Sequence, residues 1–188
     1  MTEATLEFAA RHSCDSPEWY TPSPFVEAAR EVMGGIDLDP ASHEEANRTV
    51  KASKFYTAED DGLKQEWRGR VFLNPPGGLV KEFWLKLIDS TAVEQAIWIG
   101  YSLEQLQTLQ QTGRQGMVSP LYFPMCVTAK RIAFVENEAK RAVRVEKLTQ
   151  AGKKPNAKSS PSHSNYIIYI GPRVNVFRDI FSQFGVTR

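Results

Sequence analysis

The stretch Val71–Gly78, with the sequence Val-Phe-Leu-Asn-Pro-Pro-Gly-Gly, joins a short apolar run to a loop. Residues 71–73 are typical of a short buried strand, and the prolines and glycines that follow prevent both strand and helix from continuing. Helical spacing resumes over 79–91 and places four apolar side chains on one face: Phe83, Trp84, Leu87 and Ile88. This strand, loop and helix form one unit of an α/β sheet.

Strands and helices alternate on both sides of this unit. Short apolar runs predict strands at 36–39, 96–100, 131–135 and 166–170, and apolar periodicity predicts helices at 24–33, 103–111 and 174–184. We therefore predict an α/β fold, with one sheet that carries helices on both faces. Ligands bind such sheets at the carboxyl ends of the strands. The loops 39–42 and 74–77 each follow a predicted strand, so both are expected at that edge.

The composition predicts one globular domain over residues 1–188. Of these residues 41% are hydrophobic and 24% charged, and a chain of this size can bury a core without disulfides. Cys14 and Cys126 lie far apart and are expected to be free thiols in a reducing compartment, which favours the cytoplasm. We expect no signal peptide and no membrane span. His12, His43 and His163 match no ligand spacing, so no metal is expected.

The charge of the chain is balanced overall but uneven along its length. A formal net charge of +1 and a pI near 7.8 predict no strong global attraction to nucleic acid, so any contact with DNA requires a local patch. The segment 137–164 is predicted as a basic loop insertion that could order on binding. Its cations are the expected phosphate contacts: Lys140, Arg141, Arg144, Lys147, Lys153, Lys154 and Lys158.

Asn74, Pro75 and Pro76 predict a turn that accepts hydrogen bonds. The residue before a proline is held out of helical geometry, and the prolines lack an N–H group. The turn is therefore stiff, and it presents the Asn74 side-chain oxygen and the Pro75 carbonyl oxygen. Two fixed acceptors suit a planar amino group such as N6 of adenine, because they favour the pyramidal geometry that develops as the nitrogen attacks. From these residues alone, a plain turn stays open as the alternative.

Asn74-Pro75-Pro76 resembles the (Asp/Asn)-Pro-Pro-aromatic motif of amino-methyltransferases. Four further motifs follow the same pattern: Trp19-Tyr20-Thr21-Pro22, Asp39-Pro40-Ala41-Ser42, Asp61-Gly62-Leu63 and Arg131-Ile132-Ala133-Phe134. Their order resembles that of the phage-type DNA N-6-adenine methyltransferase family, over roughly Glu18 to Gly171. The resemblance implies a Rossmann-like, S-adenosylmethionine-dependent methyltransferase fold. It also implies a site-specific, adenine-specific DNA methyltransferase that flips its target base out of the helix.

The resemblance implies a role for each motif. The catalytic residues are expected to be Asn74, Pro75 and Pro76. The residues expected to bind S-adenosylmethionine are Trp19, Thr21, Pro22, Asp37, Asp39, Pro40, Ala41 and Asp61. Asp37 or Asp39 would face the positive charge or the amino group of this cofactor, and Asp61 its adenine ring. DNA is the implied partner, and the implied location is the cytoplasm of a bacterial host that carries the phage or prophage gene.

Two departures from the family pattern leave other functions open. Ser42-His43-Glu44-Glu45 stands where a Gly-rich loop is usual, and Gly77 stands where an aromatic residue stacks on the flipped base. Phe83, Trp84 or Tyr122 could substitute for that aromatic residue, or activity could be lost. The alternatives are a catalytically inactive nucleic-acid-binding protein on a methyltransferase fold, and a methyltransferase that acts on RNA adenine or protein glutamine.

Overall fold

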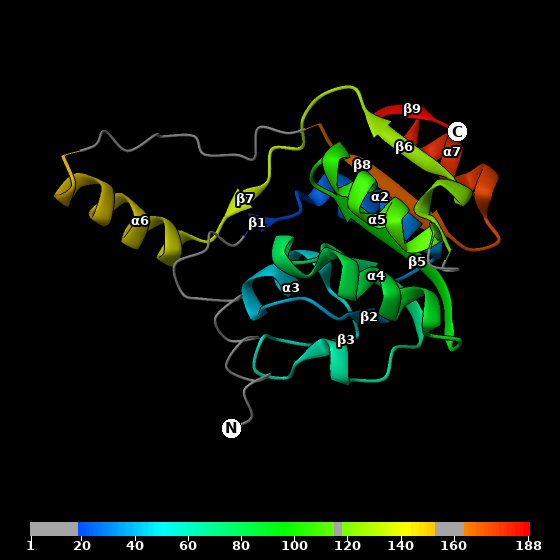
Figure 1. Ribbon diagram of the computed structural model, residues 1–188, viewed down its shortest axis with the longest axis horizontal. Helices are drawn as coiled ribbons and strands as arrows, with labels where there is room; N and C mark the ends of the chain where they lie inside the picture. The colour runs from blue at the N-terminus through cyan, green and yellow to red at the C-terminus, as the bar shows by residue number, and fades with distance from the viewer. Residues whose placement is uncertain (1–18, 115–117, 153–163) are drawn as a thin grey trace.

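Strand β4 (Gly69–Leu73) lies where the apolar run at 71–73 predicts it, inside a seven-stranded sheet (Figure 1). The computed structural model describes residues 19–114, 118–152 and 164–188. The strand order is β3-β2-β4-β5-β8-β6-β9. The other strands of this sheet are β2 (Leu38–Asp39), β3 (Lys54–Phe55), β5 (Val93–Gly100), β6 (Met125–Thr128), β8 (Tyr166–Ile170) and β9 (Gly185–Thr187).

One half of the sheet is parallel and the other is antiparallel. Strands β3, β2, β4 and β5 run in the same direction, whereas β8, β6 and β9 pair antiparallel with their neighbours. Asp39, Leu73 and Gly100 end three neighbouring parallel strands, so the loops after them leave the sheet at one edge. The two loops singled out by the sequence, 39–42 and 74–77, therefore share that edge.

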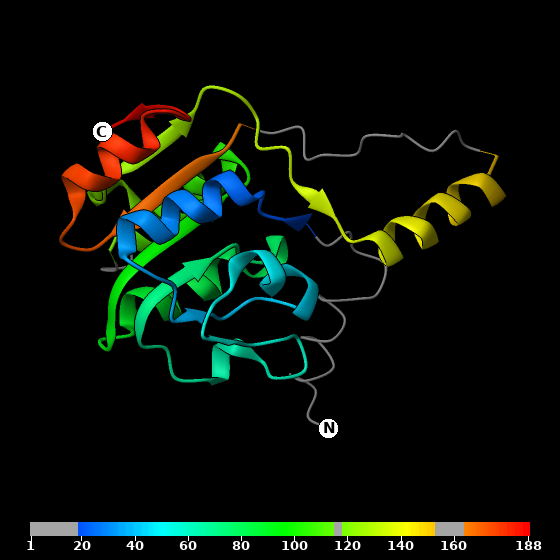
Figure 2. The same cartoon turned by 180° about the vertical axis from the view of Figure 1, so that it is seen from behind.

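Helices cover both faces of the sheet, as predicted for the α/β class. Helices α2 (Ser23–Met33), α3 (Glu44–Val50) and α7 (Val174–Phe181) lie on one face, and α4 (Val80–Asp89) and α5 (Leu103–Arg114) on the other (Figures 1 and 2). Side chains that alternate along β4 point to opposite faces of the sheet, and each face carries its own hydrophobic core. Phe72 packs with α2 and α7, while Leu73 packs with α4 and α5.

A ribbon and a helix lie outside this body. Strands β1 (Trp19–Tyr20) and β7 (Val135–Glu136) pair antiparallel, and α6 (Glu138–Gln150) projects from them away from the sheet (Figures 1 and 2). Part of the expected basic loop is thus a helix. Asn137 caps it, since its side chain accepts from the Lys140 N–H, and Lys, Arg, Glu and Ala favour helix. None of the side chains of α6 is buried.

Several details differ from the sequence-based expectations. Strand β6 was not expected, and the predicted strand 131–135 reduces to β7, although Ile132 and Phe134 are buried in the core. Short 3-10 helices stand at η1 (Gly62–Lys64), η2 (Gly77–Leu79) and η3 (Pro120–Tyr122). In the part of the chain that the structure describes, no helix is long and apolar enough to cross a membrane.

Candidate active site

Asn74 directly follows β4, and its side chain is fixed by the backbone of β1. The Asn74 Nδ2 group donates to the carbonyl oxygen of Trp19 at 2.9 Å. A carbonyl only accepts hydrogen bonds, so this contact decides which end of the amide faces Trp19. The Oδ1 atom therefore faces away as an acceptor. Within residues 19–114, 118–152 and 164–188, no group donates to it.

The two prolines continue the acceptor-rich turn. Pro75 is buried, and Pro76 is half-buried with φ −58° and ψ 134°. The Pro76 carbonyl accepts from the Leu79 N–H at 2.9 Å, which starts η2. The Pro75 carbonyl accepts no hydrogen bond from the described residues. The Asn74 Oδ1 and Pro75 carbonyl oxygens thus accept no hydrogen bond from the described residues.

Asp39 ends β2 and is buried, with 3% of its surface exposed. Its Oδ1 atom accepts from the Ala41 N–H at 3.2 Å, which turns the chain after the strand. Burial raises the pKa of Asp39 to about 7, although the Ala41 hydrogen bond acts in the opposite direction. A cationic ligand that binds beside Asp39 would therefore stabilise the ionised form of its carboxyl group.

The segment Asp61–Gly62 packs directly against Pro40. A Cβ atom on Gly62 would lie 2.0 Å from the Pro40 carbonyl oxygen, so only glycine allows this approach. The buried Trp67 indole N–H donates to the Gly62 carbonyl at 2.7 Å and holds it there. The structure therefore brings two distant motifs, Asp39-Pro40-Ala41 and Asp61-Gly62, side by side.

Two buried side-chain oxygens of the residues expected to bind S-adenosylmethionine lack hydrogen-bond partners among the described residues. They are the Thr21 Oγ1 and Asp61 Oδ1 atoms. The other oxygen of Asp61 pairs with Lys64 Nζ at 2.7 Å. A buried polar atom without a partner costs free energy, so such atoms commonly mark a place where water or a ligand binds.

Asp37, unlike Asp39, forms an ion pair with Arg70. Its carboxylate accepts from Arg70 Nε at 2.8 Å, from Arg70 Nη2 at 2.6 Å and from the Arg70 backbone N–H at 2.8 Å. These hydrogen bonds hold the pKa of Asp37 below its ordinary value. Asp37 precedes β2, whereas Asp39 ends it. Of the two aspartates expected to face the cofactor, Asp39 is therefore the one at the loop edge.

Helix α6 is anchored to the body at its first turn. The Asn137 Nδ2 group donates to the Tyr20 hydroxyl and to Glu45 Oε2, both at 2.7 Å. Arg144 forms a two-pronged ion pair with Glu136 of β7, at 2.8 and 2.9 Å. Arg144, which is expected to contact DNA, therefore also holds α6 against the β1–β7 ribbon.

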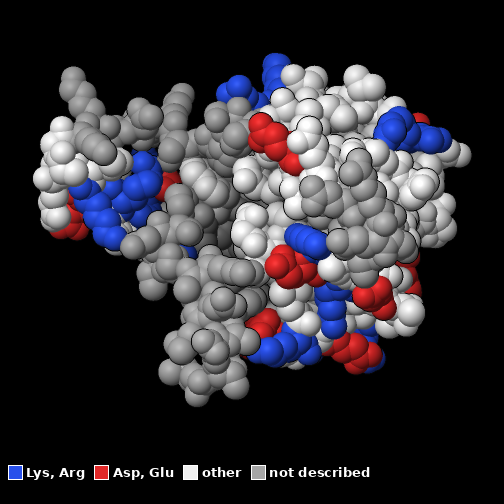
Figure 3. All heavy atoms as spheres, viewed as in Figure 1, with Lys and Arg blue, Asp and Glu red and all other residues white. Residues whose placement is uncertain are grey.

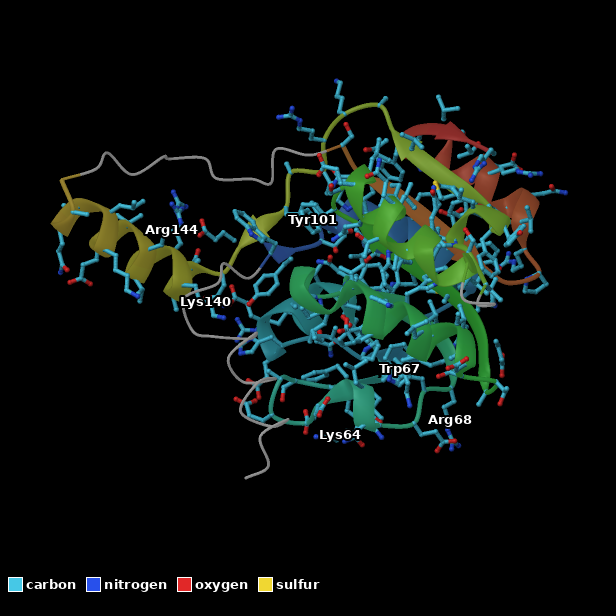
Figure 4. All side chains as sticks on the ribbon, in the orientation of Figure 1. Lys64, Trp67, Arg68, Tyr101, Lys140 and Arg144 are labelled. Atoms are coloured by element: carbon cyan, nitrogen blue, oxygen red, sulfur yellow. The ribbon has the colours of Figure 1, made fainter. Side chains whose placement is uncertain are left out.

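The other described cations of the basic segment lie along the same helix. Lys140, Arg144 and Lys147 follow helical spacing of one face, while Glu138 and Glu146 fall on the opposite side. Figure 3 shows Lys and Arg side chains gathered on this arm, and Figure 4 places Lys140 and Arg144 on it. Arg141 is exposed on the same helix. The expected contacts Lys153, Lys154 and Lys158 lie outside the described residues.

The three possible substitutes for the missing aromatic residue differ in their exposure. Phe83 and Trp84 lie on the buried face of α4, with 2% and 0% of their surfaces exposed, and Tyr122 lies in η3 with 81% exposed. Sequence reasoning missed Tyr101, whose ring carbon Cε1 lies 3.4 Å from the place of a Cβ atom on Gly77. Its position one residue after a buried strand, at the edge that carries the site, was the available signal.

A mixed α/β sheet with an acceptor-rich Asn-Pro-Pro turn at the carboxyl edge of its parallel strands is compatible with a methyltransferase fold. The family model described as DNA N-6-adenine-methyltransferase (Dam) matches residues 11–153. This match covers most of the chain, so the chain belongs to the DNA N-6-adenine-methyltransferase family, which confirms the resemblance found in the motifs. The family implies methylation of adenine in DNA and DNA as the substrate. Neither the curated proteins nor the solved structures include a match.

Proposed function

We propose that this protein transfers a methyl group from S-adenosylmethionine to the N6 amino group of an adenine that is flipped out of DNA. The observation that carries this proposal is the orientation of the Asn74 amide. The Trp19 carbonyl engages the Asn74 Nδ2 group, so Oδ1 stays available as an acceptor beside the Pro75 carbonyl. Both acceptors belong to a loop that the prolines make stiff.

The chemistry of the adenine amine fits two fixed acceptors. Its nitrogen carries two hydrogens, and its lone pair is delocalised into the ring. Hydrogen bonds to Asn74 Oδ1 and to the Pro75 carbonyl would draw electron density toward the nitrogen and favour its pyramidal form. Acceptors that are already in place cost no reorganisation as the nitrogen attacks. After methylation, the amine loses one proton to solvent, so no strongly basic side chain is required.

The residues around Asp39 fit S-adenosylmethionine. Thr21 Oγ1 and Asp61 Oδ1 are buried oxygens without partners in the described part of the chain, and each can accept or bind a polar group of a ligand. Asp39 supplies a buried carboxylate at the end of β2. Trp19, Pro22, Pro40 and Ala41 would complete the pocket. When bound, this group would supply a methyl carbon on a cationic sulfur, and the C–S bond would break as the N–C bond forms.

The sheet order supports a Rossmann-like methyltransferase domain. The parallel strands β3, β2, β4 and β5 place the proposed cofactor loop and the proposed catalytic turn on neighbouring strands. In open α/β sheets, ligands bind in the crevice outside these carboxyl ends. Asp39 and Asn74, which end β2 and follow β4, would thus face the donor and the acceptor of the methyl group.

Helix α6 is the proposed DNA contact. A target adenine inside a duplex must leave the stack before it can reach the Asn74 turn. An α-helix fits the major groove of B-DNA, and the cations of α6 lie on an exposed arm beyond the main body. Contacts between Lys140 or Lys147 and phosphates would supply affinity, and the ribbon β1–β7 would connect the arm to the catalytic turn.

The test is transfer of labelled methyl from S-adenosylmethionine to unmethylated double-stranded DNA, with RNA and a protein mixture in parallel. Label in DNA that appears as N6-methyladenine after digestion, and that disappears in Asn74→Ala, is the expected result. Label only in RNA or in protein glutamine would contradict DNA as the substrate. Absence of label, together with no thermal stabilisation by the cofactor, would favour an inactive binding protein on the same fold.

A further inference from the structure

Gly77 and Gly78 carry no side chains beside the Asn74 turn, and the space at Gly78 is open. Both glycines are exposed, and no heavy atom lies within 4 Å of a Cβ atom built on Gly78. An adenine that is bound only through hydrogen bonds from its amino group to two acceptors could still rotate about that contact. The site therefore needs a flat surface against the face of the base.

Tyr101 lies beside Gly77. Its Cε1 atom lies 3.4 Å, and its hydroxyl oxygen 3.7 Å, from the place of a Cβ atom on Gly77. The ring thus occupies the volume next to the side chain that Gly77 lacks. Figure 4 places Tyr101 close to β1, on the side of the body from which the arm projects.

The strand register explains why Tyr101 reaches the turn. Strands β4 and β5 pair Leu73 with Trp98, so Asn74 and Ile99 are the next residues along each chain. Alternate residues of a strand share a face, which puts Tyr101 on the same side as Ile99 and Asn74. Tyr101 also packs against the apolar cluster that includes Ile99, and this contact leaves part of its surface accessible.

A buried asparagine fixes the backbone of Tyr101. The Nδ2 group of Asn165, whose side chain is fully buried, donates to the Tyr101 carbonyl at 2.8 Å. The Oδ1 atom of Asn165 accepts from the Ile132 N–H at 2.7 Å. The tyrosine is thus held from two sides, by its backbone and by the apolar packing of its ring.

We propose that Tyr101 is the aromatic surface on which the target adenine stacks, in place of a side chain at position 77. Enzymes that act on extruded bases bind them by edge hydrogen bonds together with aromatic stacking. Here the edge contacts come from the loop after β4 and the face contact from the residue after β5. This inference rests on the proposed adenine methyltransferase activity.

The experiment compares steady-state methyl transfer to DNA by Tyr101→Leu and Tyr101→Phe with that of the unsubstituted protein. Leucine keeps an apolar side chain against the cluster but has no ring. We expect Tyr101→Leu to lower kcat/KM for DNA about tenfold to a hundredfold, and Tyr101→Phe to change it less than about threefold. The KM for S-adenosylmethionine and the cofactor-induced rise in Tm should stay unchanged in both variants.

A second variant separates stacking from packing. Gly77→Phe introduced together with Tyr101→Leu supplies a ring from the other strand, in space that the smaller side chain vacates. Recovery of most of the lost kcat/KM is expected if a ring at this place is what the base requires. Val186→Ala, which also shortens an exposed apolar side chain but lies on β9 outside the proposed site, is the control and should keep full activity.

Three outcomes would overturn the inference. Full activity of Tyr101→Leu would show that the base does not stack there, while the proposed methyltransferase function would stand. If Tyr101→Leu loses activity and the double variant does not recover it, Tyr101 has a packing role only. The same conclusion follows if Tyr101→Leu also loses the stabilisation by the cofactor. Absence of DNA methylation by the unsubstituted protein would remove the proposed function and this inference together.

Discussion

The side-chain amide of Asn74 donates to the backbone carbonyl of Trp19 at 2.9 Å, across 55 positions of sequence. Trp19 pairs in turn with Glu136 in the β1–β7 ribbon, and Glu136 forms the ion pair with Arg144 of α6. One continuous set of contacts therefore joins the proposed catalytic turn to the basic arm. DNA that binds the arm would therefore act on the strand that orients the proposed catalytic amide.

Substitution of Asn74 by alanine removes the oriented acceptor. We expect kcat for DNA methylation to fall about 100-fold to 1,000-fold, as for other preorganised hydrogen-bonding groups. Cofactor binding, measured by thermal shift, should persist, because Asn74 lies outside the Asp39 loop. Asn175→Ala on the exposed side of α7 is the matched control. Unchanged turnover of Asn74→Ala would remove the assignment of this turn as catalytic.

The buried Asp39 carboxyl predicts a pH dependence of stability. Its pKa is raised from 3.8 to about 7 in the folded protein, so the folded state binds more protons than the unfolded state between these values. Stability of the free protein should therefore fall as pH rises from about 4 to about 7. Between pH 5.5 and pH 8, the carboxylate should cost about 2 kcal/mol of unfolding free energy, a cost that Asp39→Asn lacks.

The measurement is denaturant unfolding of Asp39→Asn and the unsubstituted protein at both pH values, without cofactor. The variant should gain relative stability at pH 8 and lose most of the cofactor-induced stabilisation. An equal pH dependence in the two proteins would mean that Asp39 ionises without hindrance in the folded state.

The Asp37–Arg70 pair is expected to stabilise the fold without binding the cofactor. Asp37→Asn weakens three hydrogen bonds to Arg70 and should cost about 1–2 kcal/mol at pH 7. The folded pKa of Asp37 is lowered, so its contribution is present above the ordinary pKa of 3.8 and is lost as pH falls below it. The unfolding free energies of variant and unsubstituted protein should converge as pH falls through the folded pKa of Asp37, which lies below 3.8.

The control for this pair is Asp179→Asn on α7, which is exposed and should change little. The cofactor-induced rise in Tm should be equal in Asp37→Asn and the unsubstituted protein. A loss of that rise in Asp37→Asn alone would return Asp37 to the cofactor pocket expected from the family resemblance.

Charge removal on α6 should weaken DNA binding in a salt-dependent way. Lys140→Gln and Lys147→Gln are each expected to weaken binding about fivefold near 0.15 M salt and to reduce the slope of log K against log salt by about 1. Fluorescence anisotropy with labelled duplex DNA at several salt concentrations measures both effects. Arg178→Gln on α7, away from the arm, should leave the slope unchanged (Figure 1). Equal slopes in all variants would exclude α6 as the phosphate contact.

The sequence determined much of the parallel half of the sheet and its loops. The apolar run before Asn74 forms β4, and the Asn-Pro-Pro turn follows it, because two prolines and two glycines permit no regular structure at that place. The same local chemistry predicted that the loops after β2 and β4 share one edge. It also made the family recognisable, since motif order is a property of the chain alone.

The tertiary structure decided what depends on distant partners. Strand β6 exists because β8 and β9 flank it, and Asp37 and Asp39, two residues apart, differ because Arg70 of another strand engages only the first. The role of Tyr101 likewise depends on register, since pairing of Leu73 with Trp98 brings it to Gly77. Local sequence fixes backbone preference, whereas contacts between residues far apart in the chain fix which side chains meet.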